Sequence, residues 1–132
     1  MKSMKTSIYS IHILAAFLAT MLLSACGGSS NSPEGVAKQF FTAITKGDVK
    51  TATACSTKEN QKGGSVAFMV GLAQASLQEK GEIKNIETNP ISVSGDTAAV
   101  KVITTFKKDG STDETVIGLA KENGAWKVAD VK

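Results

Sequence analysis

Residues 97–106, which read TAAVKVITTF, decide the fold class of this chain. One face of this stretch carries every second side chain, namely Ala98, Val100, Val102, Thr104 and Phe106. Successive side chains of a strand point to opposite faces, so this period of two predicts a half-buried strand. Turn signals flank it, Ser94-Gly95-Asp96 before and Lys108-Asp109-Gly110-Ser111 after. We therefore expect an antiparallel sheet built around these residues.

Further strands follow the same pattern on both sides of this stretch. Residues 115–121 predict a strand, and Asn123-Gly124 is the strongest short hairpin signal before a last strand over 125–131. Residues 83–94 predict a first strand, interrupted near Asn89-Pro90. On the last strand we expect Trp126 to face the helices as a core residue.

Helical signals dominate the chain upstream of these strands. Ser32-Pro33-Glu34 is a typical helix start, with a capping Ser and a Pro in the first turn. An apolar stripe follows at Val36, Ala37, Phe40, Phe41 and Ile44. Asp48 can cap a short second helix, and a third is predicted over 65–80, with Val66, Met69, Val70, Ala73 and Leu77 on one face. Helices before a meander of strands predict an α+β domain, with the helices packed on one face of the sheet.

The first 25 residues have the pattern of an export signal. Lys2 and Lys5 precede a mostly apolar stretch over 8–23, which is shorter than the roughly 20 apolar residues of a spanning helix. Leu23-Ser24-Ala25-Cys26 resembles the bacterial lipobox, in which the Cys accepts a lipid. We therefore expect a signal peptide over 1–25, a lipidated Cys26 with a flexible tether over 26–32, and one domain over 33–132. A permanent membrane helix is the alternative.

Lipidation at Cys26 would make the membrane the first partner of the chain. Stable anchoring needs more than one acyl chain, such as palmitate, and the triacylated N-terminus of bacterial lipoproteins meets that need. By resemblance to Gram-negative lipoproteins, Gly27 lacks the Asp that retains proteins at the inner membrane, so the outer membrane facing the periplasm is expected. Cys55 would then be the second cysteine, with no disulfide in the mature chain, and its helical spacing favours a small buried side chain over a reactive thiol.

Composition excludes some function classes. The 132 residues suffice for a single domain. Without Lys2 and Lys5, 13 of the 15 basic residues remain against 12 acidic ones. All the basic residues are Lys, and they alternate with acidic residues instead of clustering. A nucleic-acid partner is therefore not expected.

Four motifs together resemble one family of small lipoproteins. They are residues 32–44 (SPEGVAKQFFTAI), Lys46-Gly47-Asp48, residues 95–100 (GDTAAV) and residues 123–128 (NGAWKV). These stretches look like the DUF4878 group, which is similar to the NTF2-like, cystatin-like superfamily. The resemblance spans about residues 32–131 and implies a curved antiparallel sheet of about four strands wrapped against helices, the NTF2-like cone. It implies no catalytic residues, because the group is functionally uncharacterised.

The chemistry of the mature chain points away from an enzyme. Some enzymes of this shape, of the ketosteroid isomerase type, use an acidic base and a Tyr, but Tyr9 and His12 would leave with the signal. Asp48, Asp96, Asp109 and Asp113 each adjoin turn or cap residues, which explains an acidic side chain by local hydrogen bonding. Zinc sites favour Cys and His, and no calcium-binding loop pattern is present in the sequence. We expect no catalytic site, cofactor or metal. An isomerase- or hydrolase-like enzyme that uses the NTF2-like pocket is the less favoured alternative.

Binding is the remaining class, with three variants. The larger apolar residues could line a small-ligand pocket or only form the core; they are Phe40, Phe41, Phe68, Met69, Phe106 and Trp126. An envelope protein is the other candidate partner, and a homodimer through the open sheet face could use Ile103, Ile117 and Leu119. A ligand binder should contain a cavity of roughly 300 to 1,000 Å³. An interaction module should instead show a filled core and an exposed apolar patch.

Overall fold

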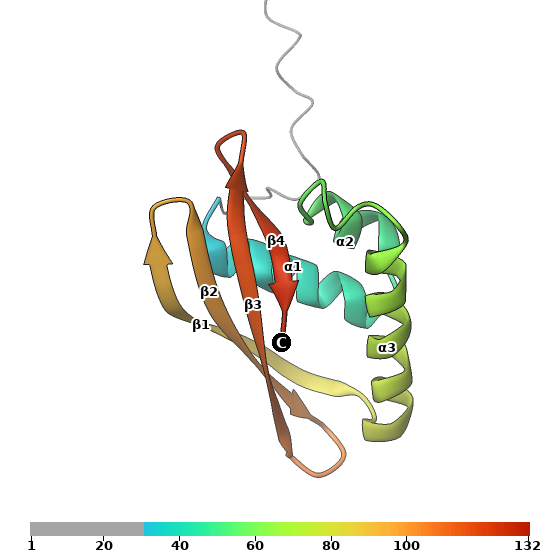
Figure 1. The fold of residues 1–132 in the computed structure, drawn as a ribbon. Coiled ribbons are helices and arrows are strands. Elements are labelled where there is room, and N and C mark those ends of the chain that lie inside the picture. Colours follow the sequence, from blue (N-terminus) through green and yellow to red (C-terminus); the bar gives the residue numbers. More distant parts are fainter. Residues whose placement is uncertain (1–30) are drawn as a thin grey trace, which may run out of the picture.

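The computed structural model describes residues 31–132, which form three helices followed by four strands (Figure 1). The helices are α1 (Pro33–Lys46), α2 (Val49–Ala54) and α3 (Ser65–Lys80). The strands are β1 (Ile83–Ser94), β2 (Thr97–Phe106), β3 (Thr112–Glu122) and β4 (Ala125–Val131). The predicted signal peptide and Cys26 lie outside the described residues.

The helix boundaries are set by the residues that the sequence pattern indicated. The backbone N–H of Gly35 donates to the Ser32 side chain at 3.1 Å, and Pro33 opens α1. Gly47 ends the helix with φ of +76°, a conformation that L side chains rarely adopt. The side chain of Asp48 then caps α2 by accepting from the backbone N–H of Thr51 at 3.0 Å. Capping chemistry thus places a sharp turn between α1 and α2.

The four strands form one antiparallel meander in the order β1-β2-β3-β4. The alternation predicted for residues 97–106 is confirmed, because all five residues of the expected inner face are buried. β3 begins at Thr112, three residues earlier than predicted. β1 is continuous, and the predicted interruption is a register shift between Pro90 and Ser92. The fold is therefore α+β with a curved, unclosed sheet, as expected.

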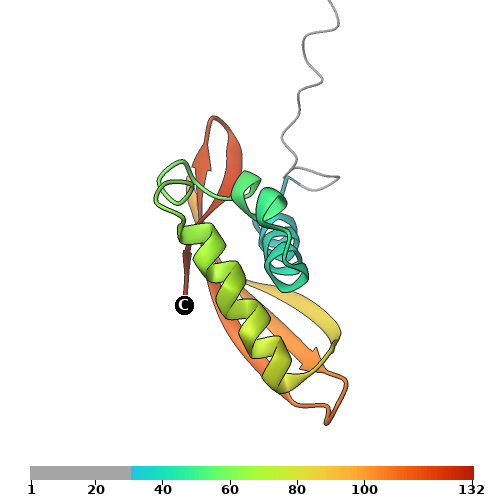
Figure 2. The same cartoon turned by 90° about the vertical axis from the view of Figure 1, so that its right-hand side faces the viewer.

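All three helices lie on the same side of the sheet (Figures 1 and 2). α1 contacts all four strands, whereas α3 packs mainly on α1 and α2. The core between α1 and the sheet includes Phe40, Val100, Ile117 and Val128, all fully buried. Every helix and strand of this core lies within residues 33–132.

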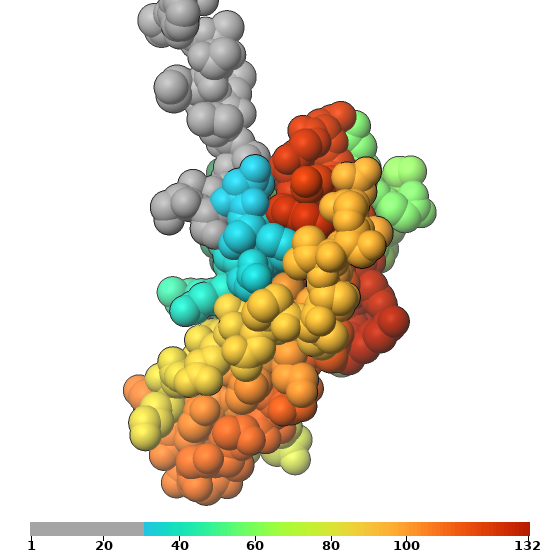
Figure 3. Space-filling model, turned by 90° about the vertical axis from the view of Figure 1, so that its left-hand side faces the viewer, coloured from blue at the N-terminus to red at the C-terminus, as the bar shows by residue number. Residues whose placement is uncertain are grey.

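The two edges of the sheet differ. The chain after α2 pairs with β4, since Val128 donates its backbone N–H to the Cys55 carbonyl at 2.7 Å and accepts from Thr57 at 3.0 Å. The Asn60 side chain donates to the Ala129 carbonyl at 2.8 Å. On the outer side of β1, in contrast, residues 31–132 supply no strand, and β1 runs along the surface in yellow to gold (Figure 3). Pro90 within β1 lacks an N–H, which makes this edge a poorer template for another strand.

The dimer surface predicted from the sequence is wrong for two of its three residues. Ile117 and Leu119 are buried on the inner face of the sheet, against the helices, and only Ile103 lies on the outer face. In antiparallel pairing, Ile117 lies opposite Val100 and Leu119 opposite Ala98, which fixes them to the core side. Among the described residues, no helix is long and apolar enough to cross a membrane.

Candidate functional site

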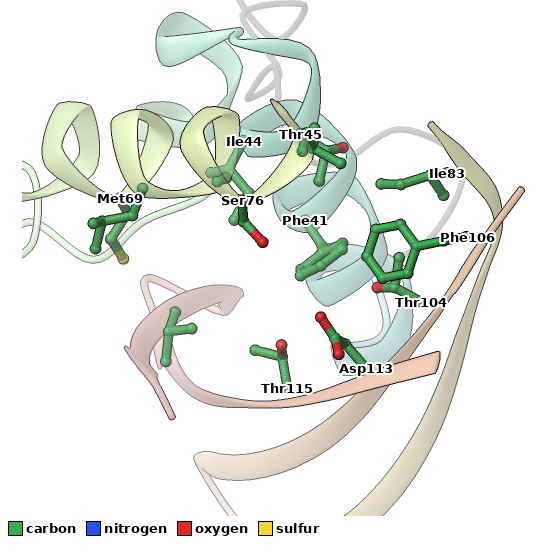
Figure 4. A pocket seen from close by; sticks show the side chains of 14 residues that line it. Phe41, Ile44, Thr45, Met69, Ser76, Ile83, Thr104, Phe106, Asp113 and Thr115 are labelled. Atoms are coloured by element: carbon green, nitrogen blue, oxygen red, sulfur yellow. The ribbon is translucent and has the colours of Figure 1, made fainter. Parts of the chain in front are cut away.

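A cavity of about 250 Å³ lies between α3, the end of α1 and the inner face of the sheet (Figure 4). We call it the α3 pocket. Its apolar wall is formed by Phe41, Ile44, Met69, Leu72, Ala73, Leu77, Ile83, Phe106 and Val131. Its polar lining consists of Thr45, Ser76, Thr104, Asp113 and Thr115. The pocket exists because α3 packs on the other helices and leaves space above the strands.

One polar atom in this pocket is buried without a partner. The Thr104 side chain is 2% exposed, and its Oγ1 makes no hydrogen bond. Leaving a buried hydroxyl unpaired destabilises a fold by about 1 to 3 kcal/mol. Such a group in a native structure requires an explanation, and Thr104 is one of the residues that line the pocket.

Charged groups meet beside Thr104 at the pocket mouth. Asp113 lies directly opposite Thr104 in the pairing of β2 with β3, and its carboxylate forms an ion pair with the ammonium of Lys80 from α3. The same ammonium lies 5.7 Å from the centre of the Phe106 ring, a distance at which a cation is attracted to the ring face. The mouth of the pocket therefore already holds a cation between a carboxylate and an aromatic ring.

The six residues predicted to line a pocket or core fall into three groups. Phe41, Met69 and Phe106 line the α3 pocket, as one alternative predicted. Phe40 and Trp126 belong to the closed core, at 0% and 5% exposure. Phe68 is 68% exposed on α3 and lines a different, more open hollow between the start of α3 and the end of β4, so it belongs neither to the core nor to the α3 pocket. Val66 and Val70 occupy the inward face of α3 instead, and Phe68 is turned away from them.

Asp113 is a site residue that its sequence neighbours do not reveal. Its place beside turn residues predicts a local hydrogen-bonding role, but it belongs to β3 and lines the pocket. The turn ends at Ser111, and an earlier start of the strand would have placed Asp113 and Thr115 on the face shared with Ile117.

The described residues contain no other cluster typical of catalysis or metal binding. No group of three or more His, Cys, Asp or Glu in this part of the chain could hold a metal ion. Three exposed carboxyls have a lowered pKa for local reasons. A backbone hydrogen bond from Thr51 lowers the pKa of Asp48, a hydrogen bond from Lys107 that of Glu82, and the Ser111 hydroxyl and N–H that of Asp109. All three lie outside the α3 pocket.

Cys55 is fully buried, as predicted, next to the core residue Ala52. The structure holds it in a disulfide bond, which the sequence analysis did not expect. The other cysteine of the sequence is Cys26, which lies outside the described residues. A thioether-linked lipid would occupy the sulfur of Cys26, so lipidation and a disulfide at that residue exclude each other.

Comparison with known proteins finds a family model that matches the sequence and solved structures with a similar fold. The model of a domain of unknown function, DUF4878, matches residues 24–129. No curated protein matches the sequence. The fold is similar to that of an NTF2-like protein from Campylobacter jejuni that is provisionally described as a transpeptidase. That likeness has a TM-score of 0.66 and 21% identity and covers 75% of this chain and 98% of that one. A SEC-C motif containing protein from Rhodopseudomonas palustris is similar with a TM-score of 0.55 and 18% identity over 83% of this chain and 80% of that one. At these identities the likeness shows the fold alone.

Proposed function

Because the chain belongs to the DUF4878 family and has an NTF2-like fold, we propose that it is a lipid-anchored, non-catalytic binding module of the bacterial cell envelope. Its binding site is the α3 pocket. The observation that carries the binding function is the buried hydroxyl of Thr104, which has no hydrogen-bond partner in a mainly apolar pocket. A few convergent polar groups in an apolar cavity are typical of small-ligand sites.

The size of the pocket favours a small ligand. Its volume of about 250 Å³ is slightly below the range expected for drug-sized ligands, but larger than an engineered apolar cavity of about 150 Å³ that binds benzene. Exposed apolar side chains are also present on α3, at Phe68 and Leu72. Leu72 belongs to the wall of the α3 pocket, whereas Phe68 lines a different hollow that contains no buried unsatisfied polar side chain, so the α3 pocket is the better supported site.

The lining chemistry supports binding without catalysis. Asp113 is the one titratable residue among those that line the pocket, and it is already paired with Lys80. General acid–base catalysis needs a positioned group able to give or take a proton near the working pH. An acyl transfer such as a transpeptidase performs needs an activated nucleophile, and the one carboxylate among the lining residues is paired with Lys80 instead of hydrogen-bonded to Ser76, Thr104 or Thr115. The description of the Campylobacter relative is therefore not extended to this chain.

The anchor is supported by the lipobox-like Leu23-Ser24-Ala25-Cys26 and by its distance from the domain. Cys26 precedes Pro33, the first residue of α1, by seven positions. A chain of that length spans at most about 25 Å when fully extended. Lipidation at Cys26 would thus hold the domain close to the membrane surface, and Gly27 favours the periplasmic face of the outer membrane in a Gram-negative host.

Metabolic labelling with a palmitate analogue in the native host tests the anchor. The wild-type chain should be labelled and should fractionate with membranes, whereas Cys26→Ser should lose the label and keep residues 1–25. Cys55→Ser is the matched control, because it removes the other sulfur and should leave labelling unchanged. Undiminished labelling of Cys26→Ser, or a mature chain from the host whose Cys26 sulfur is in a disulfide, would overturn the anchor.

A further inference from the structure

The ammonium of Lys80 indicates what chemistry the pocket mouth accepts. It sits between the Asp113 carboxylate and the ring of Phe106, the two groups at the mouth that attract a cation. Lys80 reaches this place from the last turn of α3, and its side chain is 40% exposed. A long, flexible and partly exposed side chain can swing into solvent at little energetic cost. A ligand ammonium could then take its place.

The hydrogen-bonding capacity of the lining residues also favours a ligand group that donates hydrogen bonds. An ionised carboxylate only accepts hydrogen bonds, while a hydroxyl can accept as well as donate. Asp113 lies opposite Thr104 across the β2–β3 pair, and both line the pocket, with Thr115 on the same face of β3. Figure 4 shows the Asp113 carboxylate and the Thr115 oxygen pointing into the cavity. The three N–H donors of a primary ammonium match these acceptors.

The carboxylate of Asp113 also disfavours the binding of an anionic ligand. Asp113 is the one charged residue lining the pocket. A ligand carboxylate placed beside Thr104 would meet the carboxylate of Asp113 directly across the strand pair, and like charges directly opposite each other are unfavourable.

The volume and the apolar wall of the pocket determine the size and polarity of the rest of the ligand. The space of about 250 Å³ holds about eight water-sized groups, at roughly 30 Å³ for each. Its wall is formed by aromatic and aliphatic side chains, including Phe41, Met69 and Phe106. An apolar body of about six or seven carbons, with a polar head, has this size.

We propose that the α3 pocket binds a small primary amine with an apolar chain, whose ammonium replaces that of Lys80 at Asp113 and donates to the unpartnered hydroxyl of Thr104. This inference rests on the proposed binding function and names the ligand class. It makes Lys80 a competitor that occupies the cation site while the ligand is absent.

Three probes of eight non-hydrogen atoms each test this directly: heptylamine, heptan-1-ol and hexanoate. Their affinities for residues 31–132 are measured by NMR titration at neutral pH and low salt. The amine should bind severalfold more tightly than the alcohol, because its ammonium takes over the ion pair of Lys80 with Asp113 and adds a charge-assisted hydrogen bond to Thr104, which is stronger than one from a neutral hydroxyl. Hexanoate should bind most weakly. Raising the salt concentration should reduce the preference for the amine and leave the binding of the alcohol unchanged.

Two variants separate the cation site from the pocket itself. Asp113→Asn should lose the preference for the amine and keep the affinity for the alcohol. Lys80→Met, which keeps the length of the side chain and removes its charge, should bind heptylamine severalfold more tightly than the wild type. Glu114→Gln is the matched control, since Glu114 pairs with Lys101 on the opposite face of the sheet and should change nothing.

The outcomes distinguish this inference from the binding function on which it rests. Equal affinities for amine and alcohol, or no gain in amine affinity on Lys80→Met, would overturn the amine specificity and leave a pocket for neutral ligands. Failure of all three probes to bind at millimolar concentration would overturn both. If Asp113→Asn fails to fold, Lys80→Met and the salt dependence still decide the question.

Discussion

Thr104 on β2 and Asp113 on β3 lie directly opposite each other, and both side chains face the same pocket. The hydroxyl of Thr104 has no partner, while the carboxylate of Asp113 is paired with Lys80. The sheet thus places an unsatisfied polar atom next to a charged group, in a pocket whose wall is mainly apolar. This pair locates the binding site.

Replacing Thr104 with Val should make the domain more stable and the pocket a weaker binder. Val keeps the branched shape and removes a buried hydroxyl without a partner, so we expect a gain of about 1 kcal/mol in the free energy of unfolding. Amine and alcohol affinities should both fall. Denaturant unfolding and NMR titration measure the two effects, with Thr105→Val on the outer face as control. A loss of stability on Thr104→Val would mean that the hydroxyl is satisfied in solution.

Replacing Trp126 with Ala should severely destabilise the domain. Trp126 is 5% exposed on the inner face of β4, and its ring lies 5.0 Å from the ammonium of Lys121. Truncating a buried aromatic residue costs about 3 to 5 kcal/mol, a large share of the roughly 5 to 15 kcal/mol that stabilises a small domain. Trp126→Phe should lose much less. A melting temperature of Trp126→Ala within a degree or two of the wild type would refute this assignment.

Two phenylalanines should respond in opposite ways to truncation. Phe40 is fully buried, so Phe40→Ala should cost about 3 to 5 kcal/mol. Phe68 is 68% exposed, and Phe68→Ala should change the stability by no more than about 0.5 kcal/mol. Urea unfolding of residues 31–132 measures both. Comparable losses of stability for the two variants would show that Phe68 is buried and that α3 is rotated about its axis from the orientation described above.

Acid should weaken the cap of α2. The backbone N–H of Thr51 lowers the pKa of Asp48, so the stabilisation from this carboxylate is complete above its unfolded value of about 3.9. It is lost as the pH falls through the lower, folded value. Asp48→Asn can still cap the helix but does not titrate. The difference in melting temperature between the wild type and this variant should change from pH 5 to pH 3. A difference independent of pH would contradict the role of the Asp48 charge.

The sequence predicts the buried face of an element best where its periodicity leaves only one apolar face. In β2 the alternation leaves only one apolar face, and Trp126 follows from the same rule in β4. In α3 the predicted face is confirmed for Val66 and Val70, but Phe68 and Leu72 on the other side are apolar as well. A helix that is apolar on several sides does not show by itself which large side chains stay exposed. The exposure of Phe68 depends on how α3 packs on α1 and α2.

The pocket was also beyond prediction from sequence, although three of its residues were named. Its volume depends on how far α3 stands from the sheet, and that distance follows from helix packing. The pairing of Thr104 with Asp113 depends on the register of β2 and β3. A one-residue difference in that register would turn Asp113 to the opposite face.

Native mass spectrometry of the mature protein, taken from its own host in mild detergent, tests the central claim most directly. We predict a chain that begins at Cys26 and carries acyl groups on that residue, together with a small noncovalent adduct that is lost on collisional activation. The adduct should be absent or reduced in Thr104→Val. A chain that carries no lipid and no adduct would contradict an anchored binding module.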